Sequence, residues 1–233
     1  VRSCQMITVP SEWVANDIVE AFEIQRSKVA VVPFGSTNLF PKDHCNAADV
    51  RAKYRLDRPF FFYPSRTYPH KNHRFLLEAF RPVADQADLV LTGPSWFRDR
   101  SVSDAARQLG LSGKVRHLGM VSRAELAGLY QAAAALVYPT RFEGFGAPVL
   151  EAMSMHCPVI ASNVTAIPEV AGDAAVLLDP GDLEGWTEMM EKLLSDEDLR
   201  QLLIGKGDAR AGDFSWERSA RLQLDAYRIA AGQ

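Results

Sequence analysis

The stretch Thr140–Glu151 contains residue types that suit an anion and hydroxyl groups at once. It follows an apolar run, Ala132–Tyr138, that is typical of a buried strand. Gly144 and Gly146 permit a tight turn in which a ligand can approach the backbone closely. Pro148 favours the first position of a helix, because its missing N–H is not needed there. The sequence therefore predicts a glycine turn that leads from the end of a strand into the N-terminus of a helix.

That helix is predicted to run to about His156, and its N-terminus suits a phosphate because its free N–H groups and dipole favour negative charge. Two carboxylates flank this end, Glu143 before the turn and Glu151 one turn into the helix. Carboxylates beside an anion repel it unless they bind something else, and sugar hydroxyls can donate hydrogen bonds to them. The stretch therefore has the outline of a sugar-nucleotide site.

A second stretch with unusual charge follows the apolar run Phe60–Tyr63 and leads into a helix predicted over His73–Ala84. Its start carries basic side chains where acidic ones are normally favoured: Lys71, His73 and Arg74. On a solvated surface each such charge would cost ~0.3–1 kcal/mol, whereas a bound anion would offset the cost. We favour the anion, because Arg66 adds a cation just after a strand, where open α/β sheets bind ligands.

Composition narrows the class of protein. The 233 residues are 47% hydrophobic, which allows a sizeable core, and the net charge of −3 argues against a nucleic-acid binder. The three cysteines, an odd number, stand far apart with no Cys-x-x-Cys pair, which indicates neither a zinc knuckle nor a disulfide framework and fits a reducing, cytoplasmic location. No apolar run approaches the ~20 residues that span a bilayer, and no signal peptide is recognisable.

Strands and helices alternate roughly six times from Phe60 onward, which predicts a doubly wound parallel sheet of the Rossmann-like α/β class. Continuous apolar strands fit a sheet that is covered on both faces. After Phe60–Tyr63, the predicted strands are Asp88–Thr92, Val115–Leu118, Ala132–Tyr138, Pro158–Ser162 and Ala175–Leu178. The intervening helices are predicted near Ser103–Leu109, from Ser122 to Gln131 with a Ser-x-x-Glu capping box, and over Ala166–Ala171.

The two ends of the chain are predicted to lie outside this sheet. Strands Met6–Val9 and Val29–Val32, with a helix over Glu12–Phe22 capped by Ser11, form a single β-α-β unit that is too small to bury its own faces. The polar segment 36–58 is interpreted as a linker with a short helix over Ala47–Tyr54. After the last strand, helices are predicted over Leu183–Leu194, from Asp196 to about Ile204 with Ser195 as its cap, and over Trp216–Ala230.

Glu143-Gly-Phe-Gly…Glu151 forms a Glu-x7-Glu motif that resembles the signature of the family 4 retaining glycosyltransferases, which have the GT-B fold of two facing Rossmann-like domains. Further matching segments follow in order: Ile7–Gly35, Phe61–Asn72, Ile160–Gly172, Leu178–Asp182 and Phe214–Glu217. The resemblance implies the C-terminal half of a GT-B fold. Residues 1–35 would be the last β-α-β unit of the N-terminal domain, 36–58 a linker, 59–213 the nucleotide-sugar donor-binding domain and 214–233 a C-terminal helix.

The resemblance also implies roles for single residues. Arg66 and Lys71 would neutralise the donor diphosphate, and Glu143 would hold hydroxyls of the donor sugar. The turn would line the sugar and phosphates at Gly144, Phe145, Gly146 and Ala147. Glu151 would accept hydrogen bonds from the ribose. The nucleobase would lie, largely against backbone, near His117, Gly119 and Met120.

The implied reaction is transfer of a hexose from a nucleotide-diphosphate sugar to a glycan or lipid-linked acceptor with retention at the anomeric carbon. It would use no metal, no cofactor and no protein nucleophile, and GDP-mannose is slightly favoured over UDP-sugars as the donor. The glycine-rich loop and acceptor contacts of the family's first domain are absent from this sequence. We therefore expect nucleotide binding but little transfer by this chain alone, with any peripheral membrane contact made through that first domain. A nucleotide-sugar epimerase of the same fold and a non-catalytic nucleotide-sugar-binding module remain alternatives.

Other polar groups have simpler interpretations. Asp196-Glu197-Asp198 resembles the Asp-x-Asp metal motif of a different glycosyltransferase fold, but it follows Ser195 and is predicted to be the acidic first turn of a helix. Glu169 is interpreted either as a surface carboxylate at the end of a helix, which we favour, or as a residue that supports the site from behind the ligand-contacting residues. The histidines form no His-x-x-x-His pair, so no metal site is expected among His44, His70, His73, His117 and His156.

Overall fold

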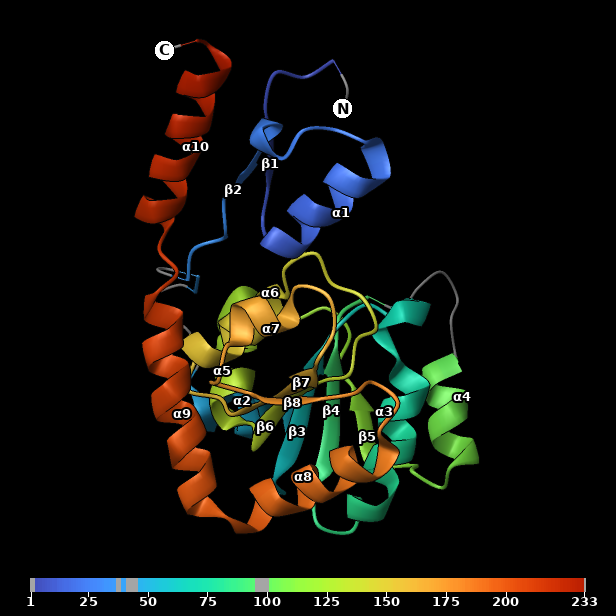
Figure 1. Ribbon diagram of the computed structural model, residues 1–233. Helices are drawn as coiled ribbons and strands as arrows, with labels where there is room; N and C mark the ends of the chain where they lie inside the picture. The colour runs from blue at the N-terminus through green and yellow to red at the C-terminus, as the bar shows by residue number, and fades with distance from the viewer. Residues whose placement is uncertain (1–2, 37–38, 41–45, 95–100, 233) are drawn as a thin grey trace.

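A computed structural model describes residues 3–36, 39–40, 46–94 and 101–232. Its centre is a six-stranded parallel sheet with the strand order β5-β4-β3-β6-β7-β8 (Figure 1). The strands are β3 (Phe60–Pro64), β4 (Asp88–Thr92), β5 (Val115–His117), β6 (Ala135–Tyr138), β7 (Val159–Ser162) and β8 (Val176–Leu178). The apolar residues of the central strands are buried on both sides, as the continuous apolar runs predict. The predicted Rossmann-like sheet is therefore confirmed.

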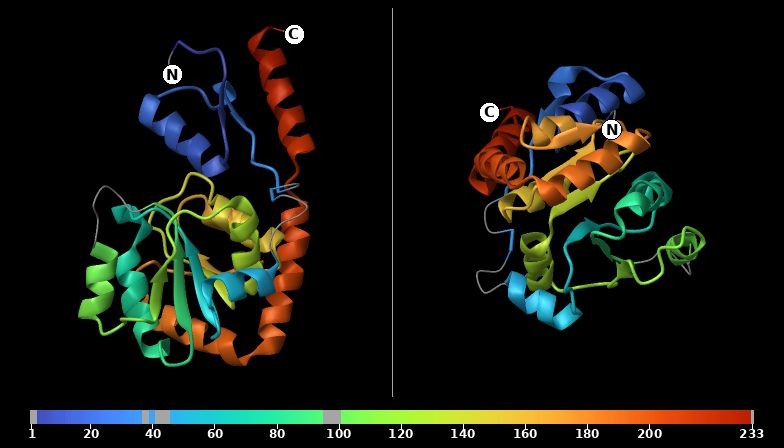
Figure 2. Two further views of the ribbon diagram at one scale, coloured as in Figure 1. Left: turned by 180° about the vertical axis from the view of Figure 1, so that it is seen from behind. Right: turned by 90° about the horizontal axis from the view of Figure 1, so that it is seen from below.

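Helices cover both faces of this sheet (Figure 2). On one face α3 (His73–Phe80) packs against α8 (Leu183–Ser195) and α4 (Ser101–Gln108). On the other face α2 (Ala47–Tyr54) packs against α5 (Arg123–Ala132), and α6 (Ala147–Ser154) packs against α9 (Glu197–Gly212). The buried side chains of these elements form one hydrophobic cluster, which includes Val50 and Leu56 from the segment predicted to be a linker.

The strand order reverses between β3 and β6. From β3 the chain adds β4 and then β5 on one side, and from β6 it adds β7 and then β8 on the other. The two strands are neighbours, with Phe61 paired to Ala135 and Phe62 paired to Leu136. At such a reversal the loops from the carboxyl ends of the two strands diverge and leave a crevice, which is where open α/β sheets bind ligands.

A smaller unit precedes the sheet. Strands β1 (Ile7–Val9) and β2 (Val29–Val31) pair in parallel, and α1 (Glu12–Phe22) connects them. The side chain of Ser11 accepts a hydrogen bond from the Val14 N–H and caps α1, as predicted. Val9, Ala15 and Val29 form a separate small hydrophobic cluster. This unit lies at the carboxyl end of the large sheet, beside α10 (Trp216–Ala230), which projects past that end (Figure 1).

The chain leaves the small unit and later returns to it at one crossing point. Ser36 donates its N–H (2.9 Å) and its hydroxyl (2.7 Å) to the carbonyl oxygen of Phe214, which joins the outgoing and returning segments. Gly35 is needed here, because a Cβ at this position would stand 2.4 Å from the backbone nitrogen of Trp216. Two adjacent backbone segments therefore connect the small unit to the large sheet.

Several predicted helix boundaries are wrong for identifiable reasons. The helix predicted over His73–Ala84 ends at Phe80 and continues as a 3₁₀ turn over Arg81–Val83, because Pro82 cannot continue an α-helix. The helix predicted to run to His156 begins at Ala147 and ends at Ser154, so Pro148 occupies its second position rather than its first. α4 begins at Ser101, two residues earlier than predicted.

The helix that was predicted to begin at Asp196 begins one residue later and is longer than expected. Asp196 is the cap, since its carboxylate accepts from the Leu199 N–H at 2.8 Å, while Ser195 ends α8. α9 continues past Ile204 to Gly212. Gly207 does not interrupt α9; it packs against Met153 of α6, which an added Cβ would meet at an ordinary contact distance of 3.4 Å.

Cys4 and Cys157 are free thiols, and Cys45 and His44 lie outside the described residues. The pKa of the Cys157 thiol is raised to about 12 by burial, so this cysteine acts as a core residue. In the described ranges no helix is long and apolar enough to cross a membrane.

Candidate functional site

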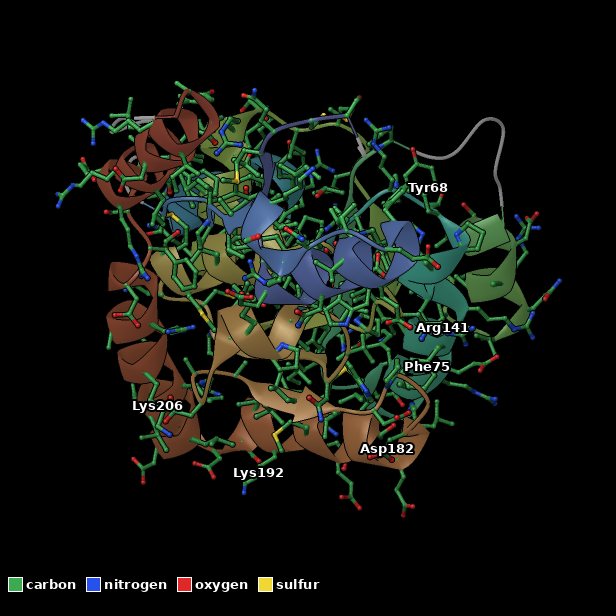
Figure 3. The ribbon with its side chains drawn as sticks, turned by 45° about the horizontal axis from the view of Figure 1, so that its top comes forward. Tyr68, Phe75, Arg141, Asp182, Lys192 and Lys206 are labelled. Carbon is green, nitrogen blue, oxygen red and sulfur yellow. The ribbon has the colours of Figure 1, made fainter. Side chains whose placement is uncertain are left out.

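The loops that leave β3 and β6 at the sheet reversal enclose a cavity of about 520 Å³, within the size range of small-molecule sites. Figure 3 looks down on this end of the molecule, where α1 lies over the loops. Most of the residues predicted to bind the donor line the cavity together: Arg66, Lys71, Glu143, Gly144, Phe145, Gly146 and Ala147. Two segments about 70 residues apart in the chain thus meet as the sequence patterns predict.

The loop after β3 supplies the cations. Arg66 is exposed and its guanidinium donates to the Tyr68 hydroxyl at 3.1 Å. The segment then forms a 3₁₀ turn over Pro69–Lys71, and the buried Tyr63 hydroxyl donates to the Lys71 carbonyl at 2.6 Å. Tyr63 therefore fixes the backbone of the lysine that reaches into the cavity.

The loop after β6 supplies a helix N-terminus. Gly146 has φ 92° and ψ 44° and precedes α6, which requires a glycine or a strained residue. The N-cap Gly146 gives α6 no side-chain cap, and the first turn carries no acidic residue. Pro148 has no N–H and the Val149 N–H donates to the Gly146 carbonyl at 2.9 Å, so Ala147 supplies the first-turn N–H that can face a ligand. Free N–H groups at the positive end of a helix dipole are suited to an anion. The prediction of a phosphate-compatible turn thus agrees with the local geometry.

Three side chains form a compact polar cluster inside the cavity. Lys71 makes an ion pair with Glu143, and each of these side chains is 14% exposed. The Tyr138 hydroxyl donates to Glu143 Oε1 at 2.7 Å and accepts from Lys71 Nζ at 3.1 Å. Burial and the nearby Glu143 charge raise the pKa of Tyr138, so its hydroxyl stays protonated and remains a donor. Sequence reasoning found the two charged residues but not Tyr138, whose only signal is its position at the end of a strand beside the turn.

Glu151 lies on α6 outside the lining of this cavity. Its carboxylate accepts from the buried Tyr130 hydroxyl at 2.9 Å and stands 3.9 Å from the Arg123 guanidinium. Its side chain is 15% exposed, and burial raises its pKa. The predicted ribose acceptor therefore already has a protein donor on one oxygen, and its role stays a prediction.

The residues predicted to flank the nucleobase lie at the end of β5, whose last residue is His117, and in the turn after it. They are at the outer edge of the sheet and outside the cavity lining. Gly119 has φ 70° and accepts from the Gly93 N–H at 2.8 Å, which joins this turn to the end of β4. Met120 is 74% exposed, and burial lowers the pKa of His117. These residues lie two strands away from the polar cluster, on the side of the crevice formed by β4 and β5.

The small unit contacts the loop that carries Glu143. The Ser11 hydroxyl donates to the Gly144 carbonyl at 2.7 Å, and the Trp13 and Phe142 rings meet edge to face at 5.3 Å. Phe145 packs between Phe34 at the crossing and Phe214, at 4.9 Å and 5.9 Å between ring centroids. The glycine turn is thus held from the side of the small unit.

Glu169, for which a surface carboxylate was the favoured interpretation, is half-buried and has hydrogen-bond partners in the small unit. Its two oxygens accept from the Glu12 N–H at 2.8 Å and from the Trp13 N–H at 3.2 Å, so it caps α1 from another part of the chain. α7 (Ile167–Ala171), which carries Glu169, packs behind the turn, where Thr165 accepts from the Glu143 N–H at 3.0 Å. Glu169 therefore has a structural role at the junction of the small unit and the sheet.

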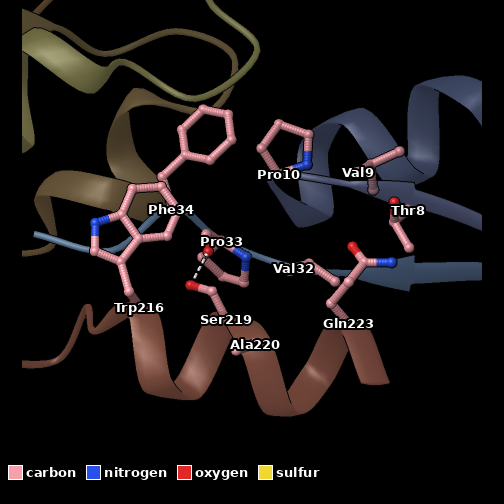
Figure 4. A pocket seen from close by; sticks show the side chains of 10 residues that line it. All are labelled: Thr8, Val9, Pro10, Val32, Pro33, Phe34, Trp216, Ser219, Ala220 and Gln223. Carbon is pink, nitrogen blue, oxygen red and sulfur yellow. Dashed lines mark hydrogen bonds between the residues drawn. The ribbon is translucent and has the colours of Figure 1, made fainter. Parts of the chain in front are cut away.

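A second, larger hollow of about 660 Å³ lies between the small unit and α10 (Figure 4). It shares Pro10 and Phe34 with the first cavity but is otherwise lined by residues from β1, β2 and α10, with no charged side chain. One hydrogen bond crosses it, from the Ser219 hydroxyl to the Pro33 carbonyl at 2.5 Å. Without charged or acid–base groups, this groove does not offer the chemistry of the first cavity.

Within the part of the chain that the structure describes, no three His, Cys, Asp or Glu side chains gather as a metal site would require. The Asp196-Glu197-Asp198 run forms a helix cap and an acidic first turn, in agreement with its simpler interpretation.

Comparison with known proteins decides the family. The family described as Glycosyl transferases group 1 matches residues 47–210, which include both loops and all of the cavity lining except Pro10 and Phe34. The chain belongs to the group 1 glycosyl transferases. The Escherichia coli protein named O-antigen chain mannosyltransferase B is 31% identical over 233 residues, which cover 97% of this chain and 61% of that protein. A D-inositol 3-phosphate glycosyltransferase of Corynebacterium urealyticum is 26% identical over an alignment that covers 98% of this chain and 57% of that protein.

Solved structures agree with the fold. The crystal structure of Anabaena HepE in complex with UDP and glucose has a TM-score of 0.85 at 18% identity, over 100% of this chain and 64% of that one. A sucrose-phosphate synthase of Thermosynechococcus elongatus has a TM-score of 0.83 at 25% identity, over 98% and 59%. The predicted GT-B family and fold are therefore confirmed, and this group 1 chain spans less than two thirds of the length of these relatives.

Proposed function

We propose that the cavity between the β3 and β6 loops binds the diphosphate and sugar of a nucleotide-diphosphate sugar, so that this chain forms the donor-binding part of a retaining hexosyltransferase. The observation that carries the proposal is the meeting of Lys71, Glu143 and the N-terminus of α6 at Ala147 in one cavity at the sheet reversal. A cation and the positive end of a helix dipole suit the diphosphate, and the carboxylate suits sugar hydroxyls.

The chemistry proposed for this site is electrostatic. As the bond between the anomeric carbon and the diphosphate breaks, negative charge grows on the leaving group. Lys71, Arg66 and the N-terminus of α6 at Ala147 would stabilise that charge in a partly desolvated cavity. The reaction would need neither a metal ion nor a protein nucleophile. Nucleotide binding that is unchanged by EDTA would support the metal-independent part of this proposal, and a requirement for a divalent ion would contradict it.

Mannose is the sugar that we favour, with GDP as the nucleotide and a glycan or lipid-linked molecule as the acceptor. The mannosyltransferase names of several relatives, among them the 31% identical Escherichia coli protein, support the sugar. The structure of Anabaena HepE with UDP-glucose supports a nucleotide sugar in general but suggests a different donor. The choice between the two donors is therefore a matter for direct measurement.

Isothermal titration calorimetry tests the proposal with GDP, UDP and ADP and with GDP-mannose and UDP-glucose. One nucleotide sugar should bind, and Lys71→Ala should weaken it about 10- to 100-fold, because a charged hydrogen bond is worth about 1.5–3 kcal/mol. Glu151→Ala should weaken the nucleotide and the nucleotide sugar alike if it binds the ribose. Lys206→Ala is a matched control, since that lysine pairs with Asp173 on the surface and should leave affinity unchanged. Failure of every nucleotide to bind would overturn the proposal.

A further inference from the structure

Tyr138 lies at the centre of the polar cluster, although its residue type alone does not mark it as a ligand-binding residue. It is the last residue of β6, next to the strand reversal, and is only 1% exposed. Its hydroxyl is bonded to both charged residues of the cavity, at 2.7 Å to Glu143 and 3.1 Å to Lys71. A buried hydroxyl that bonds to two charged side chains of the site links their positions.

A bound anion would compete within the three-way contact. In the structure Glu143 neutralises the Lys71 ammonium. A diphosphate competes for the same ammonium, so the carboxylate loses part of its counter-charge while a second anion lies beside it. The hydrogen bond from Tyr138 does not depend on Lys71, and a buried tyrosine that faces a carboxylate keeps its proton. The hydroxyl can therefore hold the Glu143 carboxylate after the ammonium turns toward the phosphates.

We infer that Tyr138 is a positioning residue that fixes the Glu143 carboxylate for the hydroxyl groups of the donor sugar while the diphosphate occupies Lys71. The inference rests on the proposed function and adds a division of labour within the site. Lys71 recognises the diphosphate, and the Tyr138–Glu143 pair recognises the sugar. Loss of the hydroxyl should then affect the part of the affinity that depends on the sugar.

Tyr138→Phe tests this division, because it removes one oxygen atom and leaves the buried ring in place. Calorimetry compares GDP-mannose with GDP, and UDP-glucose with UDP, for the variant and the unsubstituted chain. We expect affinity for the nucleotide sugar that binds to fall about tenfold, while affinity for its free nucleotide diphosphate changes by less than about twofold. A merely structural role would weaken both ligands by the same factor.

The chain contains a matched control for this substitution. The Tyr54 hydroxyl donates to Glu125 Oε1 at 2.9 Å, and Lys53 pairs with the same carboxylate, so a second Lys-Glu-Tyr group lies outside the cavity lining. Tyr54→Phe should leave both affinities unchanged. Thermal unfolding of each variant establishes that it is folded.

The double variant Tyr138→Phe/Glu143→Gln supplies a test that remains valid if Tyr138→Phe alone is unstable, because it also removes the carboxylate that the hydroxyl holds. Glu143→Gln and the double variant should lose the sugar-dependent affinity to the same extent, since residues that act through one another are not additive. Three results would overturn the inference and leave the proposed function standing. They are additive losses of affinity in the double variant, an equal loss of affinity for the nucleotide sugar and the free nucleotide in Tyr138→Phe, and no loss of affinity in Tyr138→Phe. If the unsubstituted chain binds no nucleotide at all, the proposed function itself fails, and the inference with it.

Discussion

Gly146 provides the strongest test of how the glycine turn is built. It has φ 92°, and a Cβ at this position would stand 2.5 Å from Ile167 Cδ1, whose side chain is fully buried. An L side chain in the left-handed region costs roughly 1–2 kcal/mol, and forcing a packed side chain aside costs roughly 1–3 kcal/mol. Gly146→Ala should therefore lower the free energy of unfolding by about 2–5 kcal/mol, a large part of the 5–15 kcal/mol typical of a domain.

Urea unfolding followed by circular dichroism at 25 °C measures this loss. Gly205→Ala is the matched control, because Gly205 lies inside α9 with no atom within 4 Å of an added Cβ. That substitution should raise the free energy of unfolding by up to about 1 kcal/mol, the difference in helix propensity between glycine and alanine. The two glycine-to-alanine substitutions should thus have opposite signs.

The contribution of the steric clash can be separated from that of the backbone. Ile167→Val removes the Cδ1 atom that the new Cβ would meet and costs about 0.5–1.5 kcal/mol alone. Combined with Gly146→Ala, it should cost less than the sum of the two single losses, because the clash is gone and only the backbone strain remains. A loss of under about 0.5 kcal/mol for Gly146→Ala would refute the reasoning, since surface-like substitutions fall in that range.

Three further predictions concern carboxylates that lie outside the cavity lining. Glu169→Ala removes both acceptors of the first N–H groups of α1 and should lower the free energy of unfolding in urea by about 1–2 kcal/mol. Glu169→Gln keeps one acceptor oxygen and should lower it by less. Equal losses in the two variants would contradict the capping role. The hydrogen bond from Lys53 lowers the pKa of Glu125 to about 2, so Glu125→Gln should lower the free energy of unfolding by about 2 kcal/mol at pH 7. This loss should shrink as the pH falls from 4.5, the pKa of the carboxyl in the unfolded chain, toward 2. A loss that does not change with pH would contradict the stabilising role of the charged carboxylate. Burial raises the pKa of Glu151, so ionisation of this carboxyl destabilises the folded protein as pH rises. Tyr130→Phe removes the donor that stabilises the ionised carboxylate, so in urea unfolding this variant should be destabilised more at pH 8 than at pH 5. The reverse order would contradict the direction of the pKa shift.

The sequence was sufficient where local pattern and chemistry agree. The apolar run at Phe60–Tyr63 is a strand because only a sheet covered on both faces buries every residue of such a run. The Ser122 and Glu125 capping box forms with both of its hydrogen bonds, since it depends only on residues three apart. The turn at Gly146 forms where the glycine and the following proline predict a strand-to-helix transition.

The sequence was insufficient where contacts join distant segments. Lys71 and Glu143, which form an ion pair, are 72 residues apart in the sequence. Glu169 and the Glu12 N–H that it caps are 157 residues apart. No local pattern predicts which carboxylate meets which partner, because the sheet order decides it. At Ser195-Asp196 both residues can cap a helix, and the choice of Asp196 is set by where α8 ends.

A crystal structure of the chain with its preferred nucleotide sugar, GDP-mannose or UDP-glucose, tests the central claim most directly. The account predicts diphosphate oxygens within hydrogen-bond distance of Lys71 Nζ and beside the N-terminus of α6 at Ala147. It also predicts sugar hydroxyls on the Glu143 carboxylate, with Tyr138 still bonded to that carboxylate. A diphosphate out of reach of Lys71, or a nucleotide bound in the apolar groove between β2 and α10, would contradict it.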